Sequence, residues 1–448
     1  MPRSQSSKPG RGLRAQVPRS RHADWTPSPR RRDPVEVLRG QEAGRIPSLL
    51  PIRHERMAVS AFTYFRGAAA VMAEDLAHTP SCGLRAQACG DAHLLNFGIY
   101  ATPERRVVFD LNDFDETLEA PFEWDVKRLG TSLVVAARDL GLAAAEGEAA
   151  AQAAVAAYRT RMAACARMGH LEVWYARLDG DELVTLSKRA GDRRVATGVL
   201  RKAHHSTNLG ALGKLTEVVG GKRRIIDSPP LVEHLSPADG GVDAAEVIGA
   251  YLASLDDSTR ALLRRYRIVD WARKVVGVGS VGTDDAIVLL MGDSDSDPLF
   301  LQAKEASASV LEPFAGASPY DNHGRRVVAG QRLIQSASDI LLGWTRLGER
   351  DYYVRQLRDM KGSVPVDKLS APELAQYGRA CGEALALGHA RSGDPAAIAG
   401  YLGSGDGFDR AIAAFAGVYA DQNAADYNAF LAATPVNAGH ADAAPDDA

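Results

Sequence analysis

Hydrophobic and polar residues follow two patterns along this chain, one typical of amphipathic helices and one typical of short buried strands. The first pattern predicts helices over 56–77, two within 124–169, and others over 245–266, 325–337, 371–391 and 408–433. The second predicts strands over 84–89, 106–111, 273–278, 285–291, 298–304, 339–345 and 351–357. Residues 170–240 follow neither pattern clearly. Long helices combined with clustered strands predict an α+β fold.

Both ends of the chain differ in composition from the rest. Residues 1–33 contain nine Arg and Lys among Pro, Ser and Gly, with few large apolar side chains. Such a segment cannot bury enough apolar surface to offset its ordering entropy, so we expect a disordered basic tail. Residues 435–448, which are rich in Ala and Asp, are expected to form a second disordered tail.

The overall composition narrows the class of protein. Of the 448 residues, 46% are hydrophobic and 24% are charged, which is the balance of a globular protein. The 53 Lys and Arg against 56 Asp and Glu give a net charge of −3, which argues against a generally basic nucleic-acid binder. No stretch approaches the length of apolar sequence that a membrane span needs. The four cysteines do not form a disulfide framework, and we expect a cytoplasmic protein.

A first group of polar residues follows the first two predicted strands. Asp91, His93 and Asn96 come after the first of these strands, and Asp110 and Asp113 belong to an acidic cluster at the end of the second. Carboxylates this close repel one another unless a cation lies between them, and Asp and Asn oxygens suit Mg²⁺ or Mn²⁺. One alternative is a pair of Asx-rich turns that only cap backbone groups. Another is a metal site without phosphoryl chemistry.

A glycine-rich turn forms a second candidate site. Gly277, Gly279, Ser280 and Gly282 lie in the sequence GVGSVG between two predicted strands. A dinucleotide-binding fold needs a helix after the glycines, whereas a strand follows them here, as it does in the glycine-rich loop of kinases. The backbone amides of such a loop lie over the phosphates of a nucleotide.

The next predicted strand carries a lysine that fits the same type of site. Lys304 ends the sequence Leu-Phe-Leu-Gln-Ala-Lys, and a kinase-like site would use it to bind the α- and β-phosphates. In such a site the lysine pairs with a glutamate from a helix, and Glu312 is the nearest suitable glutamate. The alternative is a glycine-rich hairpin followed by a surface lysine.

The first group resembles the catalytic and metal-binding loops of the aminoglycoside-phosphotransferase branch of protein-kinase-like enzymes. The pattern Asp91-x-His93-x-x-Asn96, followed by a strand and the pair Asp-Phe, carries this resemblance, although a cysteine replaces the first histidine of that family. The resemblance implies that Asp91 accepts the proton of the acceptor hydroxyl. It also implies that Asn96 and Asp113 hold Mg²⁺ on the phosphates of ATP, with Asp110 as the second candidate ligand.

The order of these motifs differs from that of ordinary kinases, in which the glycine-rich loop comes first. We therefore expect a two-lobed, protein-kinase-like fold that is circularly permuted, because chain termini commonly lie close together. The expected parts are a large helical lobe over 34–265 with the catalytic and metal loops, a β-rich nucleotide lobe over 266–362, and helices over 363–434 that return to the large lobe. Alternatively, the order is normal and the segment from His389 to Asp394 is the catalytic loop.

Further motifs resemble an uncharacterised bacterial family, the domain of unknown function numbered twenty-two fifty-two. They include PIRHERM with Arg53 and Arg56, FRG with Arg66, NDFDE, GVGSVGT, and a WDxKRL segment with Asp125. The resemblance covers roughly residues 34–433 and implies no substrate. Arginine clusters often bind phosphate, so the three arginines are candidate phosphate or acceptor contacts, with salt bridges as the alternative. Asp125 is expected to support the catalytic loop.

These observations favour ATP- and Mg²⁺-dependent phosphoryl transfer to an unknown hydroxyl acceptor, either a small molecule or a protein. One alternative is nucleotidyl transfer on the same fold. Another is a nucleotide-binding protein without catalytic activity. We expect no membrane partner and no specific nucleic-acid partner.

Overall fold

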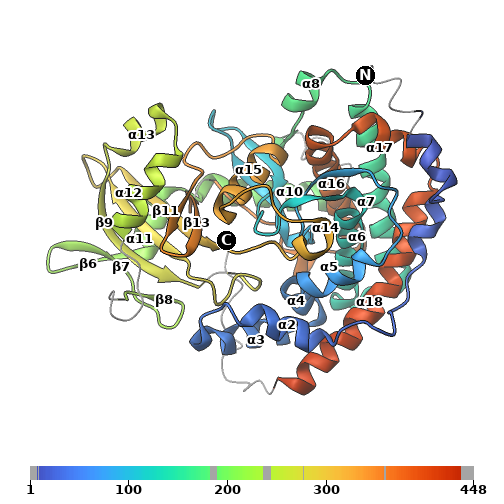
Figure 1. Cartoon of the computed structure of the whole chain (residues 1–448). Coiled ribbons are helices and arrows are strands. Elements are labelled where there is room, and N and C mark those ends of the chain that lie inside the picture. Colours follow the sequence, from blue (N-terminus) through green and yellow to red (C-terminus); the bar gives the residue numbers. More distant parts are fainter. Residues whose placement is uncertain are drawn as a thin grey trace.

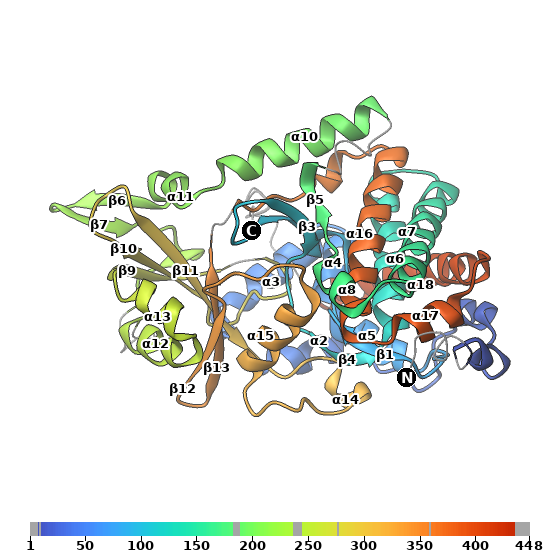
Figure 2. The same cartoon turned by 90° about the horizontal axis from the view of Figure 1, so that it is seen from above.

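The computed structural model describes residue 8 and residues 10–181, 189–235, 244–275, 277–357 and 360–434. A six-stranded antiparallel sheet lies at one end of the molecule and a group of long helices at the other, as Figure 1 and Figure 2 both show. The expected α+β class is confirmed by this arrangement. The tail expected over 435–448 lies outside the described residues.

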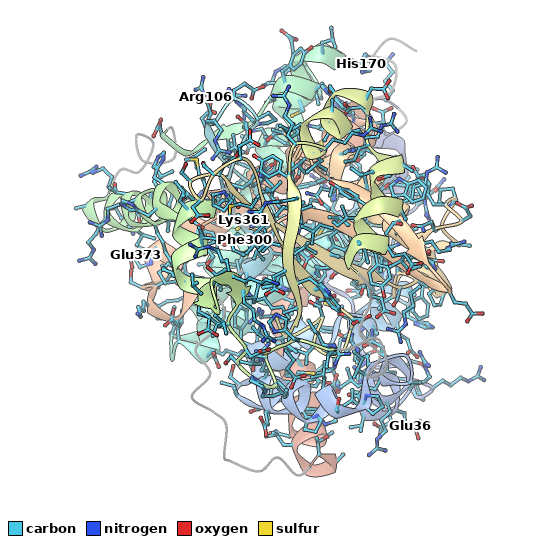
Figure 3. All side chains as sticks on the ribbon, turned by 90° about the vertical axis from the view of Figure 1, so that its left-hand side faces the viewer. Glu36, Arg106, His170, Phe300, Lys361 and Glu373 are labelled. Atoms are coloured by element: carbon cyan, nitrogen blue, oxygen red, sulfur yellow. The ribbon has the colours of Figure 1, made fainter. Side chains whose placement is uncertain are left out.

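The six-stranded sheet has the order β12-β13-β11-β10-β9-β8. Its strands are β8 (Val232–Glu233), β9 (Arg267–Lys274), β10 (Ala286–Met291), β11 (Pro298–Ala306), β12 (Gly343–Leu347) and β13 (Arg350–Gln356). β10 is a continuous apolar run and β11 is buried along nearly its whole length, because both faces of the sheet are covered. On β11, Leu301 faces one apolar cluster and Phe300 the other, since alternate side chains point to opposite faces. Phe300 lies near the middle of this end of the molecule in Figure 3.

Segments that precede the expected boundary at residue 266 pack on this sheet. One face is covered by α12 (Ala244–Tyr251) and α13 (Asp257–Leu263). The other face is covered by α11 (Asn208–Leu215) and by the hairpin of β6 (Thr216–Val219) and β7 (Lys222–Ile225). Tyr251 and Leu212 are buried in the two clusters. The helical lobe expected over 34–265 is therefore too long, because these segments bury their apolar faces against the sheet.

Long helices form the other end of the molecule. They are α6 (Phe122–Asp139), α7 (Ala144–Cys165), α16 (Ala371–Ser392) and α18 (Gly407–Ala433), and the short helix α17 (Pro395–Leu402) packs with them. Small residues let α16 approach α7 closely: a Cβ on Gly382 would stand 2.1 Å from the carbonyl oxygen of Ala154. In the described part of the chain, no helix is both long enough and apolar enough to cross a lipid bilayer.

Shorter elements complete the fold. The helices are α2 (Pro34–Glu42), α3 (Leu50–Ala58), α4 (Ala61–Gly67), α5 (Ala69–Ala77), α8 (His170–Tyr175), α10 (Ala190–His205), α14 (Glu312–Ala315) and α15 (His323–Ile334). The strands are β1 (Arg85–Ala88), β2 (Phe97–Ala101), β3 (Val107–Leu111), β4 (Leu118–Pro121) and β5 (Leu178–Asp179). β1 pairs with β4, and β2, β3 and β5 form a three-stranded sheet. α10 extends along the molecule toward α11 at the sheet end (Figure 2).

The segment 10–33 packs against the helices and does not form the disordered tail that its composition predicts. His22 is fully buried, and its Nε2 lies 2.7 Å from the hydroxyl of Tyr401. Arg31 donates hydrogen bonds to Asp75 and Asp426, with shortest distances of 2.8 and 2.6 Å. The prediction from composition fails for two reasons. Asp75 on α5 and Asp426 on α18 neutralise Arg31. Aromatic rings of the segment also pack against rings of the helices. Residues 1–7 and 9 lie outside the described residues.

Candidate functional site

The loop after β1 is fixed by hydrogen bonds to its backbone. Asp125, which is buried on α6, accepts hydrogen bonds from the backbone amides of Cys89 (2.7 Å) and Gly90 (3.0 Å). Gly90 has a φ of 84°, and a Cβ on it would stand 2.2 Å from the carbonyl oxygen of Glu116. Only glycine fits such a left-handed, crowded position. Asp125 therefore lies where the sequence predicts a support of the catalytic loop.

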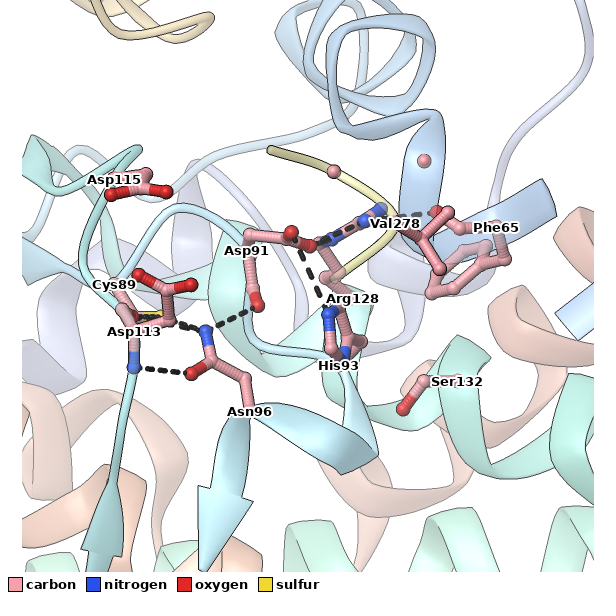
Figure 4. A network of polar contacts seen from close by, with 12 residues as sticks. Phe65, Cys89, Asp91, His93, Asn96, Asp113, Asp115, Arg128, Ser132 and Val278 are labelled. Atoms are coloured by element: carbon pink, nitrogen blue, oxygen red, sulfur yellow. Dashed lines mark hydrogen bonds and ion pairs between the residues drawn. The ribbon is translucent and has the colours of Figure 1, made fainter. Parts of the chain in front are cut away.

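Asp91 follows directly; Arg128 binds its carboxylate and His93 lies beside it (Figure 4). Arg128 of α6 donates from Nε to Oδ1 of Asp91, and His93 Nε2 lies 3.7 Å from Oδ2. Arg128 also donates to the carbonyl of Phe65 (3.0 Å) and lies 4.4 Å from the centroid of its ring. Burial lowers the pKa of His93 to about 4, so its ring is neutral at pH 7. No role was predicted for Arg128 from the sequence, although its position three residues after Asp125 on a helix places both side chains toward one loop.

Asn96 connects the loop after β1 to the loop after β3. Its Nδ2 donates to the carbonyl oxygens of Asp91 and Asp113, each at 3.0 Å, and its Oδ1 accepts from the backbone amide of Asp113 at 2.6 Å. The side chain is 4% exposed. The oxygen that a metal would use is thus engaged in joining the two loops, whereas the carboxylate of Asp113 is 41% exposed.

Lys304 of β11 connects the six-stranded sheet with the loop after β3. Its Nζ lies 2.8 Å from Oδ2 of Asp115 and 3.5 Å from Oδ2 of Asp113. Tyr353, the neighbour of Lys304 on β13, donates its hydroxyl to Oδ1 of Asp115 at 2.7 Å. Burial raises the pKa of Asp113, but Lys304 and Arg355 outweigh this effect and lower it to about 2. The first and second candidate groups therefore meet, although 191 residues separate Lys304 from Asp113.

Asp110, the second candidate metal ligand, does not join this group. Its carboxylate is 2% exposed and accepts hydrogen bonds from the backbone amides of Ser336 (2.9 Å) and Leu111 (3.0 Å). Burial raises its pKa, even though the charge of Arg391 opposes the shift. Among the described residues, no group of three or more His, Cys, Asp or Glu side chains is spaced to hold a metal ion. Of the candidate ligands, Asp113 is the exposed carboxylate that fits such an ion.

Glu312 does not pair with Lys304. Its carboxylate accepts hydrogen bonds from the backbone amides of Ser309 (3.1 Å) and Ser318 (3.3 Å) and lies 4.0 Å from Arg326. The glutamate begins the four-residue helix α14, so its side chain caps the local turns and does not reach back to the strand. Asp115 takes the position of the expected acidic partner. The acidic run after β3 contained it, but the sequence did not distinguish it from its neighbours.

The glycine-rich turn between β9 and β10 contacts the helices that carry the arginine cluster. Arg53 donates to the carbonyls of Gly279 (2.8 Å) and Val278 (3.2 Å), and Arg56 donates to the carbonyl of Gly277. Val278 is buried in an apolar cluster with side chains of α2, α3 and α4. Arg53 and Arg56 thus bind backbone oxygens of the turn, which differs from the expected contact with phosphate or acceptor.

The remaining residues of these motifs lie nearby. Ser280 accepts a hydrogen bond from the hydroxyl of Thr283 (2.6 Å) through its carbonyl oxygen, and the carbonyl of Gly282 accepts one from the backbone amide of Ile46 (2.7 Å). Burial lowers the pKa of Arg66 to about 10, although nearby Asp91 opposes the shift. Arg66 therefore stays charged near Asp91 and remains a candidate contact for an anion.

The alternative catalytic loop from His389 to Asp394 is a helix end and a cap. His389 lies within α16, where its Nε2 is 3.2 Å from Oδ2 of Asp125 and its Nδ1 is 2.8 Å from the hydroxyl of Tyr158. Asp394 is the N-cap of α17 and accepts from the backbone amides of Ala396 and Ala397. His389 therefore supports Asp125, and the segment forms the end of one helix and the cap of the next, which differs from the loop expected under the alternative order.

Two further acids border the site, Asp285, which is buried, and Glu116, which is partly buried, and the sequence predicted no catalytic role for either. Burial raises the pKa of Glu116 to about 7 and that of Asp285 also to about 7. Glu116 accepts a hydrogen bond from the backbone amide of Val310 at 2.7 Å, while Asp285 accepts from the hydroxyl of Thr283 at 3.0 Å. Both acids exchange protons near neutral pH, which makes the stability of this region dependent on pH.

Glu116→Gln is expected to flatten this dependence. Glu116 ionises near pH 4.5 in the unfolded chain and near 7 in the folded one, so the folded state binds more protons between these values and stability falls as pH rises through them. Between these pH values the unfolding free energy should therefore fall by about 1–3 kcal/mol less in the variant than in wild type. Urea denaturation on both sides of the range measures it. Glu119→Gln, at a side chain that is 69% exposed, is the control and should follow wild type; equal slopes for all three proteins would contradict the assignment.

Fold and site together define an α+β protein in which acidic loops beside the helical end meet a buried lysine of the sheet. Residues 45–433 match the family described as an uncharacterized protein conserved in bacteria, DUF2252, and the chain belongs to this family. Membership agrees with the motifs found in the sequence. No curated protein and no solved structure matches the chain. The comparisons therefore give no support to a protein-kinase-like relationship, which stays a prediction.

Proposed function

We propose that this protein is an ATP- and Mg²⁺-dependent phosphotransferase that acts on a hydroxyl acceptor, with its motifs in permuted order relative to kinases. The observation that carries the proposal is the position of Lys304 against Asp113 and Asp115. A lysine on the second strand after a glycine-rich turn, beside an exposed aspartate, is what binding of nucleotide phosphates and a divalent cation requires. A stability role alone needs neither an exposed carboxylate nor the Asn96 link to Asp91.

The catalytic step assigned to this site is an in-line transfer. The acceptor oxygen forms a bond to the γ-phosphorus of ATP, the bond between that phosphorus and the bridging oxygen breaks, and ADP leaves. Asp91 takes the proton of the acceptor hydroxyl on its carboxylate. Arg128 holds this carboxylate in one orientation, with His93 beside it. Asn96 keeps the loop of Asp91 and the loop of Asp113 at a fixed separation.

The nucleotide side of the proposed site combines the acidic loop after β3 with Lys304 and the glycine-rich turn of the six-stranded sheet. Asp113 would hold Mg²⁺, which neutralises phosphate charge, and Asp115 lies beside it. Lys304 would exchange part of its contact with these carboxylates for the phosphates. The glycine-rich turn would cover the phosphates with its amides, while Arg53 and Arg56 hold its carbonyls from the other side.

A thermal-shift measurement with ATP and Mg²⁺ tests the nucleotide site. A ligand that binds only the folded state stabilises it by about 2.7 kcal/mol at 100 times its Kd, so the wild-type melting temperature should rise. The rise should require Mg²⁺ and should disappear in Asp113→Ala. Asp295→Ala, at a side chain that is 84% exposed and outside the site, is the control and should keep the rise. A rise that persists in Asp113→Ala would contradict the metal role.

The mass of the reaction product separates the candidate functions. After incubation with ATP, Mg²⁺ and a panel of hydroxyl compounds, phosphoryl transfer adds one phosphate to the acceptor. Nucleotidyl transfer on the same fold adds a nucleoside monophosphate instead. A melting rise without any product from the panel or from self-modification would favour the non-catalytic nucleotide-binding protein.

A further inference from the structure

The hairpin of β6 and β7 extends from the edge of the sheet end in both Figure 1 and Figure 2. Its turn consists of Gly220 and Gly221, whose φ angles of 56° and 77° suit the tight turn that glycine pairs form in hairpins. At its base Ile225 is 1% exposed and anchors the hairpin in the apolar cluster of the sheet. At its tip Val218 and Val219 are 61% and 51% exposed. Neighbouring residues of a strand point to opposite sides, so both sides of the tip are uncovered and apolar.

Cations and one further exposed apolar side chain lie on the hairpin and on α11, the helix that precedes it. We call the group the hairpin patch, and its members are Leu209, Lys214, Val218, Val219, Lys222 and Arg224. Leu209 of α11 is 55% exposed. Between residues 189 and 224 the chain has nine Lys and Arg against two acidic residues, although the whole protein carries a net charge of −3. Glu217 lies on β6 itself, opposite Arg224, and Asp227 and Asp295 pair with Arg224 and Arg223, so the lysines remain in excess.

We propose that the hairpin patch binds the surface of an anionic lipid bilayer, with Val218 and Val219 inserted among the lipids and the cations at the headgroups. Separate exposed apolar residues need no explanation, but an adjacent pair at the tip of a projecting hairpin, bordered by lysines, matches the chemistry of an interface. Lys and Arg extend apolar stems toward the lipid while their charges meet the phosphates. In this proposal the protein binds the surface of a membrane and does not span it, although the sequence led us to expect no membrane partner.

A bilayer explains the patch better than a nucleic acid does. Residues 208–225, which form α11 and the hairpin, contain no Phe, Tyr, Trp or His, so this part of the chain has no ring on which bases could stack. Phosphate binding by cations would also leave the two exposed valines without a role. Insertion into a bilayer uses both features at once, because it combines apolar burial with attraction to anionic headgroups.

Co-flotation of the whole protein with lipid vesicles tests the proposal. The protein should float with vesicles of phosphatidylcholine and phosphatidylglycerol and should not float with phosphatidylcholine alone. Val218→Asp combined with Val219→Asp should weaken binding by about tenfold or more, because the apolar contribution is lost. Lys214→Glu combined with Lys222→Glu should weaken it by about fivefold or more for each lysine, and added salt should weaken wild-type binding.

Matched variants on another surface separate loss of binding at the hairpin patch from general changes in nonspecific binding. Leu171→Asp, on α8 at a side chain that is 67% exposed, and Arg167→Glu should bind anionic vesicles like wild type. All six substituted positions are exposed, and melting temperatures should show that every variant folds. Equal flotation of wild type and the valine variant would overturn the proposal. Binding of a nucleic-acid duplex in preference to vesicles, with no effect of the valines, would overturn it in favour of a nucleic-acid surface.

Discussion

Asp91→Asn is expected to lower turnover by about 10²–10⁴-fold, which is the usual contribution of a positioned general base. The amide has almost the shape of the carboxylate, so Arg128 and the loop keep a partner, but an amide cannot take the proton of the acceptor hydroxyl. ATP and Mg²⁺ bind at Lys304 and Asp113 in the proposed site, so nucleotide affinity should change little. Measured kcat should fall while the Kd for ATP, from titration, stays near the wild-type value.

The control for this variant is an aspartate with a similar environment elsewhere. Asp179 is also paired with arginines, at 3.0 Å from Arg177 and 3.4 Å from Arg106, and its side chain is 18% exposed against 20% for Asp91. Asp179→Asn should keep wild-type turnover. Turnover of Asp91→Asn equal to that of Asp179→Asn would show that Asp91 is not the base, and loss of ATP binding in Asp91→Asn alone would show that its role is in binding.

Of the substitutions considered, Lys304→Met is expected to lower the free energy of unfolding the most. Lys304 is 2% exposed, lies between two carboxylates and is 5.4 Å from the centroid of the ring of Tyr353. Removing one partner of a fully buried ion pair costs about 3–5 kcal/mol. Here the side chains of Asp113 and Asp115 are 41% and 32% exposed and regain water, so we expect a smaller loss of about 2–3 kcal/mol. Urea denaturation measures it, and ATP binding should weaken in the same variant.

A double variant shows whether the loss comes from the unpaired charge. Asp115→Asn removes the carboxylate nearest to Lys304, so in combination with Lys304→Met it should cost less than the sum of the single changes by about 1–2 kcal/mol. Lys368→Met, at an exposed lysine, is the control and should leave stability unchanged within about 0.5 kcal/mol. Strict additivity of Lys304→Met and Asp115→Asn would mean that the ion pair contributes nothing and that Lys304 stabilises the sheet only by packing.

The elements with strong hydrophobic patterns were predictable from the sequence. β10 and β11 lie within one or two residues of their predicted ends because each is a short apolar run between polar turns. α16 and α18 likewise follow their predicted ranges closely. The strand expected over 273–278 is instead β9, which begins at Arg267 and gives way to the glycine-rich turn after Lys274. The first residues of β9 are exposed and weaken the alternating pattern, so the predicted strand begins six residues after the observed one.

The predictions that proved wrong concern contacts between segments that lie far apart in the sequence. The basic segment 10–33 was expected to be disordered, because composition does not show that Asp75 and Asp426 neutralise Arg31. The helices over 244–263 were assigned to the helical lobe by sequence position, yet they bury their apolar faces on the sheet. An amphipathic pattern shows that a face is buried but not against what, since any apolar surface of suitable shape satisfies it.

The sequence by itself determined the α+β class, the family, the loop pattern of Asp91 and Asn96, and the candidate lysine, because local spacing and hydrophobic period are written in consecutive residues. Only the tertiary structure decided that Lys304 pairs with Asp115 rather than Glu312, that Asp113 rather than Asp110 faces the site, and that Arg128 holds Asp91. These choices join residues up to 191 positions apart. They depend on where a side chain points after the chain has packed, and no local pattern contains that information.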